Sequence, residues 1–595
     1  MIRSANPTAA SPGRQARALR AAMALTAGAA MTLTACSSGG SGAAGTAGTD
    51  IASVARTGVR DGGTLRWATD ELPQTLNAYQ ADASADTETI AGATLPAMYR
   101  LDGHGAPQED TDFLTGADVA QSPRQTVTYH LNPKAKWSDG RAVGAADFIA
   151  QWKALNGKNS AYWTSRNAGY DRISDVRQGK DAQQVEVTFA TPYADWRSLF
   201  SPLYPKSVTS DADTFNDGVR TKLPVVAGPF AVKAVDSKKG TVTLVRNPSW
   251  WGDRAKLDQL VLTAVPMDKR AAALAAGTLD LAEIDPETVS KVAATKGLAV
   301  RKAPDAAYAQ LAINGSTGPL ADERVRHAVA RAIDRKAIAT SVLKPLGLPA
   351  EALGNHLVLP SQNGYHDNSS ALGSNDIQQA QALLADAGWK RSTAKTGDQA
   401  AGGPGRTAAS GALTVVEPAA AVTKSGKQLS MRFVLPAGSP TLDAVGSRIA
   451  TMLSGIGIRT EITKVDGDSY FQDHIASGDF DLALYSWPGT AYPATDDTPI
   501  FAKPVPAPDG SLTVAQNYTR VGTDQIDQLL DRAGGELDAG QARDLTTKAD
   551  ARIWAAAGSV PLYQRPGLVG LRTTVANAGV FGFETPVYQN LGFRK

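Results

Sequence analysis

The chain has 595 residues, of which 43% are hydrophobic and 20% are charged, a composition typical of globular proteins. One hydrophobic core does not extend over so many residues, so we expect two or three domains. Lys and Arg number 60 against 58 Asp and Glu, but four Arg and no acidic residue lie in residues 1–35. The rest of the chain therefore has no basic excess to neutralise phosphates, which argues against a nucleic-acid partner.

Residues 1–35 predict a targeting segment. Arginines precede an apolar stretch over residues 21–33, which is too short to span a bilayer. The stretch ends in Leu33-Thr34-Ala35-Cys36, which resembles the bacterial lipobox, in which the cysteine becomes the lipid-bearing N-terminus. Cys36 is the only cysteine of the chain, so the sequence predicts lipid attachment there and no internal disulfide. The alternative is an incidental cysteine in a cleaved signal peptide.

Residues 36–61 are rich in Gly, Ala, Ser and Thr, and we predict a flexible tether over this range. The folded body is expected from residue 62, with a short strand over residues 62–67. A second pattern, over residues 128–147, predicts a strand, a turn at Asp139-Gly140 and a helix that begins near Ala145. Trp137 is expected to pack beneath that turn.

Further elements follow up to residue 286. Residues 227–230 and 246–252 flank a predicted hairpin, and residues 271–277 predict a helix of small residues. The next strand covers residues 279–284 and stops at Asp285-Pro286. Bare acidic residues at such a strand end are usually solvated.

The order of elements is most specific over residues 311–338. A short apolar strand ends at Asn314-Gly315, and a helix is expected to begin after Asp322, a favourable N-cap. Val325, Ala328, Val329, Ala332 and Ile333 recur at helical spacing, which predicts one buried face. By pattern alone this is an ordinary strand followed by an amphipathic helix.

The last third of the chain contains a predicted insertion. Residues 377–389 predict a helix that stops at Gly388. Residues 391–428 contain few bulky apolar residues, so we predict a disordered surface insertion. Strands and helices resume at residue 429, and residues 479–493 predict a buried strand that ends in a Gly-Pro turn.

These stretches, in this order, resemble the peptide/nickel class (family 5) of ABC-transporter extracellular solute-binding proteins. The quoted sequences that carry the resemblance are DERVRHAVARAIDR at 322–335, KAKWSDG at 134–140 and RNPSWWG at 246–252. The resemblance implies an α/β, two-lobed periplasmic-binding-protein-like fold of class II, cluster C, with an extra subdomain on the first lobe. The implied domains are lobe I over 62–310 with the subdomain near 96–227, lobe II over 311–556, and a return to lobe I over 557–595.

The resemblance also implies a mechanism and partners. A lipid-anchored monomer on the outer face of the cell membrane would capture a small ligand or oligopeptide by lobe closure. It would then deliver the ligand to a permease that works with a separate ATPase. The alternative is a regulatory lipoprotein of cell-envelope glycolipid synthesis, because a mycobacterial lipoprotein linked to phosphatidylinositol-mannoside synthesis is similar to a divergent member of this family.

The expected ligand site follows from the same resemblance. Peptide-binding relatives carry an Asp that pairs with the peptide ammonium, but this chain has Ala491 at that position. Asp496 and Asp497 are possible substitutes, although their spacing does not show it. The alternative for the aromatic candidates is that they are core residues. The predicted ligand-binding residues are Asn77, Glu283, Tyr485, Trp487, Tyr492 and Tyr563.

Motifs for catalysis or cofactor binding are not apparent in the sequence. It contains no Walker A pattern, no G-x-S-x-G and no H-E-x-x-H, and its six His are scattered without ligand spacing. We therefore predict a binding protein that uses no cofactor or metal, rather than an enzyme. A hydrolase on an unfamiliar scaffold is the weakest alternative.

Overall fold

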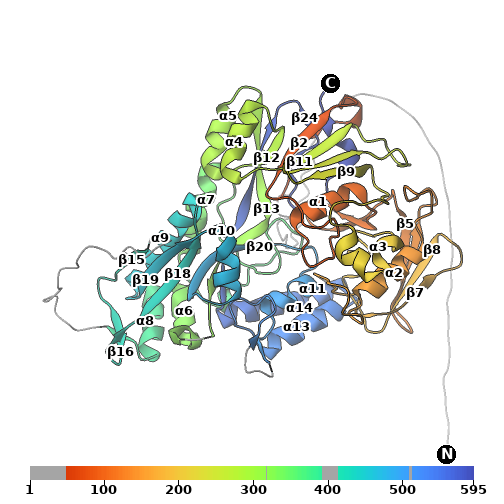
Figure 1. The fold of residues 1–595 in the computed structure, drawn as a ribbon. Coiled ribbons are helices and arrows are strands. Elements are labelled where there is room, and N and C mark those ends of the chain that lie inside the picture. The colour runs from red at the N-terminus through yellow and green to blue at the C-terminus, as the bar shows by residue number, and fades with distance from the viewer. Residues whose placement is uncertain (1–47, 166, 317, 392–412, 508–511) are drawn as a thin grey trace, which may run out of the picture. The chain divides into compact units, whose positions relative to one another are not determined.

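A computed structural model describes residues 48–165, 167–316, 318–391, 413–507 and 512–595. Eleven strands of these residues form one mixed sheet (Figure 1). Their order is β15 (Thr414–Val416), β19 (Arg459–Val465), β18 (Ser430–Pro436), β20 (Leu482–Pro488), β13 (Leu298–Ile313), β23 (Ser559–Arg572), β12 (Leu281–Glu283), β2 (Thr64–Thr69), β11 (Gln259–Ala264), β10 (Thr241–Arg246) and β9 (Phe230–Asp236).

Two long strands, β13 and β23, connect the two halves of this sheet. They pair antiparallel in two stretches, and the register breaks between Pro304 and Tyr308 and again beside Ala309. Pro304 lies opposite Pro566, and neither residue has an N–H to donate to the ladder. The break therefore interrupts the ladder where the chain passes from lobe I to lobe II. We call residues 304–308 and 563–566 the hinge.

Lobe I combines parallel pairing of β2 with β11 and β12 with the predicted extra subdomain. That subdomain holds a four-stranded sheet of β5 (Leu114–Ala120), β6 (Thr126–Leu131), β8 (Gln184–Phe189) and β7 (Ile173–Gln178), beside helix α2 (Ala145–Leu155). Trp137 is fully buried, and its Nε1 donates to Asp147 Oδ2 at 3.0 Å. The prediction that Trp137 packs beneath the turn is confirmed.

Lobe II places helices against the sheet of β18, β19, β20 and the lobe II ends of β13 and β23. Helix α6 (Glu323–Ala332) begins as predicted, because the Asp322 side chain accepts from Arg324 N. Its predicted apolar face is buried and packs in one core with α7 (Arg335–Leu343), α8 (Ile377–Asp386) and α9 (Pro440–Gly455). The remaining long helices, α13 (Asp524–Gly535) and α14 (Ala539–Ala556), pack on each other.

The predicted tether over 36–61 is wrong for its described part, residues 48–61. Strand β1 (Asp50–Ile51) pairs with β25 (Gly579–Val580), and Ala52 and Val59 are buried. The Asp50 carboxylate also accepts from Arg301 Nη1 at 3.1 Å and from Lys302 N at 2.9 Å, both on β13. Small residues indicated flexibility, but backbone pairing and one carboxylate hold this segment, which we call the strap.

The predicted disordered insertion over 391–428 is wrong for residues 413–428, while residues 392–412 lie outside the described part of the chain. Strand β15 extends the main sheet by pairing with β19. Strands β16 (Val422–Lys424) and β17 (Lys427–Gln428) form a small sheet with β14 (Lys390–Arg391). Val422 is 3% exposed in the lobe II core. This buried side chain and the pairing of strands at the sheet edge therefore offset the entropy cost of ordering a segment with few apolar residues.

Candidate functional site

The strongest candidate site begins at the C-terminal end of β20. Tyr485 lies opposite Gln310 and Trp487 opposite Tyr308 on β13. Because alternate residues of a strand share a face, the two aromatic side chains of β20 lie on the same face of the sheet. Tyr485 is 8% exposed, whereas Trp487 is only half-buried. The predicted aromatic pair is therefore formed, with Trp487 as its more accessible member.

Two aromatic residues that sequence reasoning missed complete this surface. Tyr518 stacks on Trp487, with ring centroids 5.8 Å apart and planes 6° apart. Phe471 meets Tyr518 edge to face at 5.1 Å and is 40% exposed. We call Phe471, Tyr485, Trp487 and Tyr518 the aromatic wall. Phe471 lies on a π-helix over Tyr470–Ala476 and Tyr518 follows a short hairpin, so no periodicity in the sequence predicts their meeting.

Beyond Pro488-Gly489, lobe II touches lobe I through polar groups. Thr495 Oγ1 donates across the lobes to Asp195 Oδ2 at 2.6 Å, and within lobe II Thr490 Oγ1 donates to Asp496 Oδ2. Burial raises the pKa of Asp195 to about 6, and the negative charge of Asp496 contributes to the rise. Within the described residues neither carboxylate has a basic partner at ion-pair distance. We call this contact the polar interface.

Tyr492 and Asp497 lie on the same segment. Burial, with the charges of Asp195 and Asp496, raises the pKa of Tyr492. Asp497 is 6% exposed, and burial raises its pKa well above the usual range. In the described part of the chain its carboxylate accepts no hydrogen bond. Burial therefore disfavours the negative charge of the Tyr492 hydroxyl and of the Asp497 carboxylate, which lie on this segment.

The polar interface also includes a second set of contacts between lobe I and lobe II. Arg172 Nη2 of lobe I pairs with Asp531 Oδ1 of α13 at 2.9 Å, and Ala194 N donates to Gly534 O at 2.8 Å. A cleft of about 590 Å³ opens beside this pair, with Arg172 and Asp531 in its lining. These groups are partly exposed, so the ion pair contributes little to stability.

Glu283 lies at the end of β12, as predicted for the edge of the ligand site. Its side chain is 41% exposed and pairs with Arg565 of the hinge at 3.3 Å. Burial nevertheless raises the pKa of Glu283, partly offset by Arg565. The carboxylate is thus accessible to a ligand, although Arg565 already compensates part of its charge. Glu283 therefore remains a ligand-site candidate.

Two predicted site residues are core residues, which corrects their placement at the ligand. Asn77 is fully buried, its Nδ2 donates to Phe215 O at 2.9 Å, and its Oδ1 accepts from Tyr79 N. Tyr563 is 3% exposed and packs in the lobe II core. The hydrogen-bonded turn at Asn77 and the register shift of β23 near Tyr563 turn both side chains inward, and neither could be predicted from residue type.

The fold itself defines a class of protein. Two α/β lobes share a pair of crossing strands, with an extra subdomain on the first lobe, as in periplasmic-binding-protein-like proteins of cluster C. The model of "bacterial extracellular solute-binding proteins, family 5 Middle" matches residues 118–507. The chain belongs to the family 5 extracellular solute-binding proteins, which confirms the predicted family and fold.

Three similar proteins add detail. The oligopeptide-binding protein OppA of Mycobacterium tuberculosis is 33% identical over 584 residues, covering 95% of this chain and 92% of that protein. The probable monoacyl phosphatidylinositol tetramannoside-binding protein LpqW of the same species is 25% identical, covering 84% and 86%. The periplasmic EDTA-binding protein EppA shares the fold with a TM-score of 0.80 at 24% identity, covering 92% and 99%.

Two features are absent from the part of the chain that the structure describes. No helix there has the length and apolar character of a membrane span. No group of three or more His, Cys, Asp or Glu side chains in that part of the chain is placed to hold a metal ion.

Proposed function

We propose that this protein is a membrane-anchored solute-binding lipoprotein that captures an oligopeptide or peptide-like ligand by lobe closure and delivers it to an ABC importer. The observation that carries the proposal is the 33% identity to a protein named oligopeptide-binding, over nearly the whole of both chains. Lobe closure around a ligand needs two lobes on a bendable connection. The broken ladder of β13 and β23 is such a connection.

The chemistry of the interface suits a peptide. The aromatic wall offers broad apolar faces to side chains. Asp195 and Asp496 would attract a cationic amino terminus, and the bound cation would in turn favour the charged form of Asp497, which burial disfavours. This arrangement compensates for Ala491, which stands at the position of the family's acidic anchor.

Calorimetry with a peptide mixture, followed by single tri- to nonapeptides, tests the ligand class. We expect Trp487→Ala to weaken peptide binding at least about tenfold, since it removes a stacked aromatic face. Trp163→Ala is the matched control, because Trp163 is 54% exposed on lobe I. A folded Trp487→Ala protein that binds peptides as tightly as the wild type would refute the site.

The membrane anchor is a separate part of the proposal. Cys36 lies outside the described residues, and the lipobox pattern alone supports lipid attachment there. We expect Cys36→Ala to release the protein from membranes or to leave it uncleaved, because the small residues that follow bury little apolar surface. Cell fractionation and detergent partitioning measure this. Normal processing with unchanged detergent partitioning would overturn the lipoprotein assignment.

The second candidate function is regulation of cell-envelope glycolipid synthesis. Its support is the similarity to LpqW over 84% of the chain, together with Ala491. Native mass spectrometry of protein purified without refolding separates the two functions, because it weighs what stays bound. A peptide mass favours import. A phosphatidylinositol-mannoside mass favours regulation.

A further inference from the structure

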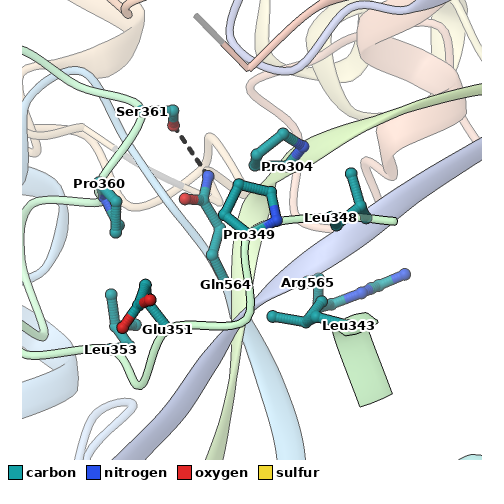
Figure 2. Close-up of a pocket in the computed structure, with 10 residues that line it drawn as sticks. All are labelled: Pro304, Leu343, Leu348, Pro349, Glu351, Leu353, Pro360, Ser361, Gln564 and Arg565. Carbon is teal, nitrogen blue, oxygen red and sulfur yellow. Dashed lines mark hydrogen bonds between the residues drawn. The ribbon is translucent and has the colours of Figure 1, made fainter. Parts of the chain in front are cut away.

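A pocket of about 130 Å³ lies at the hinge. Its apolar walls come from the hinge strands, from the last residue of α7 and from the chain between α7 and α8 (Figure 2). An apolar cavity of roughly this size holds a benzene-sized group, so the occupant has about six to eight non-hydrogen atoms. The apolar lining residues are Pro304, Leu343, Leu348, Pro349, Leu353 and Pro360.

One buried side chain leaves a hydrogen-bond acceptor unused in this pocket. Gln564 is 7% exposed, and its Nε2 donates to Asp305 O at 2.7 Å and to Ser361 Oγ at 2.8 Å. Because a backbone carbonyl only accepts, these contacts fix the nitrogen end of the amide. Within the described residues no donor reaches Oε1. Figure 2 shows the amide oxygen turned away from Ser361 toward Pro360.

The charges around the pocket are already compensated. Glu351 pairs with Lys336, and Arg565 pairs with Glu283 at 3.3 Å. A charged occupant would therefore gain no free partner here. The Gln564 amide oxygen lines the pocket and accepts no hydrogen bond from the described residues, so the pocket favours a neutral occupant that supplies one hydrogen-bond donor.

The position of the pocket links its occupation to lobe movement. Pro304 is the last residue of one ladder stretch, while Leu353 N donates to Leu562 O on the lobe II side at 3.1 Å. Bending at the hinge therefore moves the two sides of the pocket relative to each other. An occupant that fits the pocket as described here stabilises this lobe arrangement over others.

We propose that the hinge pocket binds a neutral apolar group, branched aliphatic or a six-membered ring, whose single N–H or O–H donates to Gln564 Oε1. Two sources carry this chemistry. One is a leucine-like side chain of a peptide ligand with its own backbone N–H, which rests on the proposed function. The other is a free small alcohol, which does not.

The first experiment records leucine methyl signals of the full-length protein by NMR during titration. Cyclohexanol is expected to shift the methyl signals of Leu343, Leu348 and Leu353. Methylcyclohexane matches its shape without the donor, and we expect it to bind about tenfold more weakly, because it displaces water from Gln564 Oε1 without supplying a hydrogen bond in return. Equal or tighter binding of methylcyclohexane would overturn the role of Gln564, because hydrophobicity alone predicts that order.

The second experiment distinguishes the sources with trileucine and trialanine. Leu348→Trp fills the pocket, and Leu413→Trp is the control, since Leu413 is 60% exposed. If the source is a peptide, Leu348→Trp weakens the binding of trileucine at least about tenfold and leaves the binding of trialanine unchanged. If the source is a free molecule, the same substitution abolishes the methyl shifts caused by cyclohexanol and changes the affinity for neither peptide. Should Leu348→Trp fail to fold, the wild-type shifts with both peptides decide between the sources.

Failure of the proposal and failure of the proposed function give different results. If neither cyclohexanol nor trileucine shifts these three methyl signals, the hinge pocket is not a binding site. If cyclohexanol shifts them while calorimetry detects no peptide binding, the pocket stands and the peptide function falls.

Discussion

At the hinge, lobe I and lobe II share two continuous strands, whereas at the polar interface they share a few side-chain contacts. Residues of β13 and β23 near the hinge, such as Leu311 and Val560, are fully buried. Across the polar interface the contacts are a threonine hydroxyl on Asp195, an exposed ion pair of Arg172 with Asp531, and one backbone bond from Ala194.

The difference explains how one chain can be stable and still open. The hinge strands bury apolar surface, and exposing that surface to water would cost more free energy than lobe opening could regain. Polar groups at the interface exchange protein partners for water at little net cost. Movement should therefore begin at the polar interface and bend at the broken ladder beside Pro304.

The largest effect is expected at the hinge strands. Leu311→Ala should lower the free energy of unfolding by about 2–5 kcal/mol, because it leaves a cavity in the lobe II core. Urea unfolding followed by fluorescence measures it. Leu512→Ala, at a 47% exposed position, is the control and should change little. A loss under about 1 kcal/mol at Leu311 would mean that this strand is not the stable element.

A smaller effect is expected where the insertion was predicted to be disordered. Val422→Ala should cost about 1–3 kcal/mol, since Val422 is buried in the lobe II core. Val415→Ala, at a 39% exposed position of β15, should stay within about 0.5 kcal/mol. If both substitutions lower the free energy of unfolding by an equal and negligible amount, the segment around Val422 is not packed and the prediction of a disordered insertion stands.

The strap should contribute less to the free energy of unfolding than either of these buried residues. Asp50→Ala removes two acceptors that hold β13 from outside the main ladder, and Asp50 and Arg301 are each about one-third exposed. We expect a loss of about 1 kcal/mol, measured by urea unfolding. Ser53→Ala is the control, because Ser53 is exposed and bonds only two residues away. A loss of 3 kcal/mol or more would make the strap part of the core.

The sequence predicts well those features that depend on residues adjacent in the chain. The α6 start at Asp322, the buried Trp137 turn and the aromatic pair on β20 each follow from adjacent residues, and the family match fixes the rest of the architecture. Contacts between distant segments are different. Tyr518 on Trp487 and Thr495 on Asp195 join segments 31 and 300 residues apart, and no pattern encodes such meetings. The inward turns of Asn77 and Tyr563 depend on a local turn and a bulge.

The smallest effect on stability, and the one most specific to opening, concerns Asp195. Its pKa is raised from 3.8 to about 6 in this arrangement, mainly by burial at the polar interface. The facing groups are Asp496, Thr495 and Tyr492 of lobe II and Tyr193 and Arg172 of lobe I. An open interface hydrates the carboxylate, so its pKa should fall back toward 3.8.

The sign of the pH effect follows from proton uptake. Between pH 3.8 and about 6 the closed arrangement binds more protons at Asp195 than the open one, so acid favours closure. Closure should weaken as pH rises through this window and level off above it. Small-angle scattering of the ligand-free protein should therefore show a larger radius of gyration at pH 7.5 than at pH 4.5. Asp195→Asn should flatten the profile, while Asp175→Asn, at a half-exposed lobe I position, should not. A pH profile that survives Asp195→Asn would assign the titration to another carboxylate, such as Asp497, and remove Asp195 from the opening step.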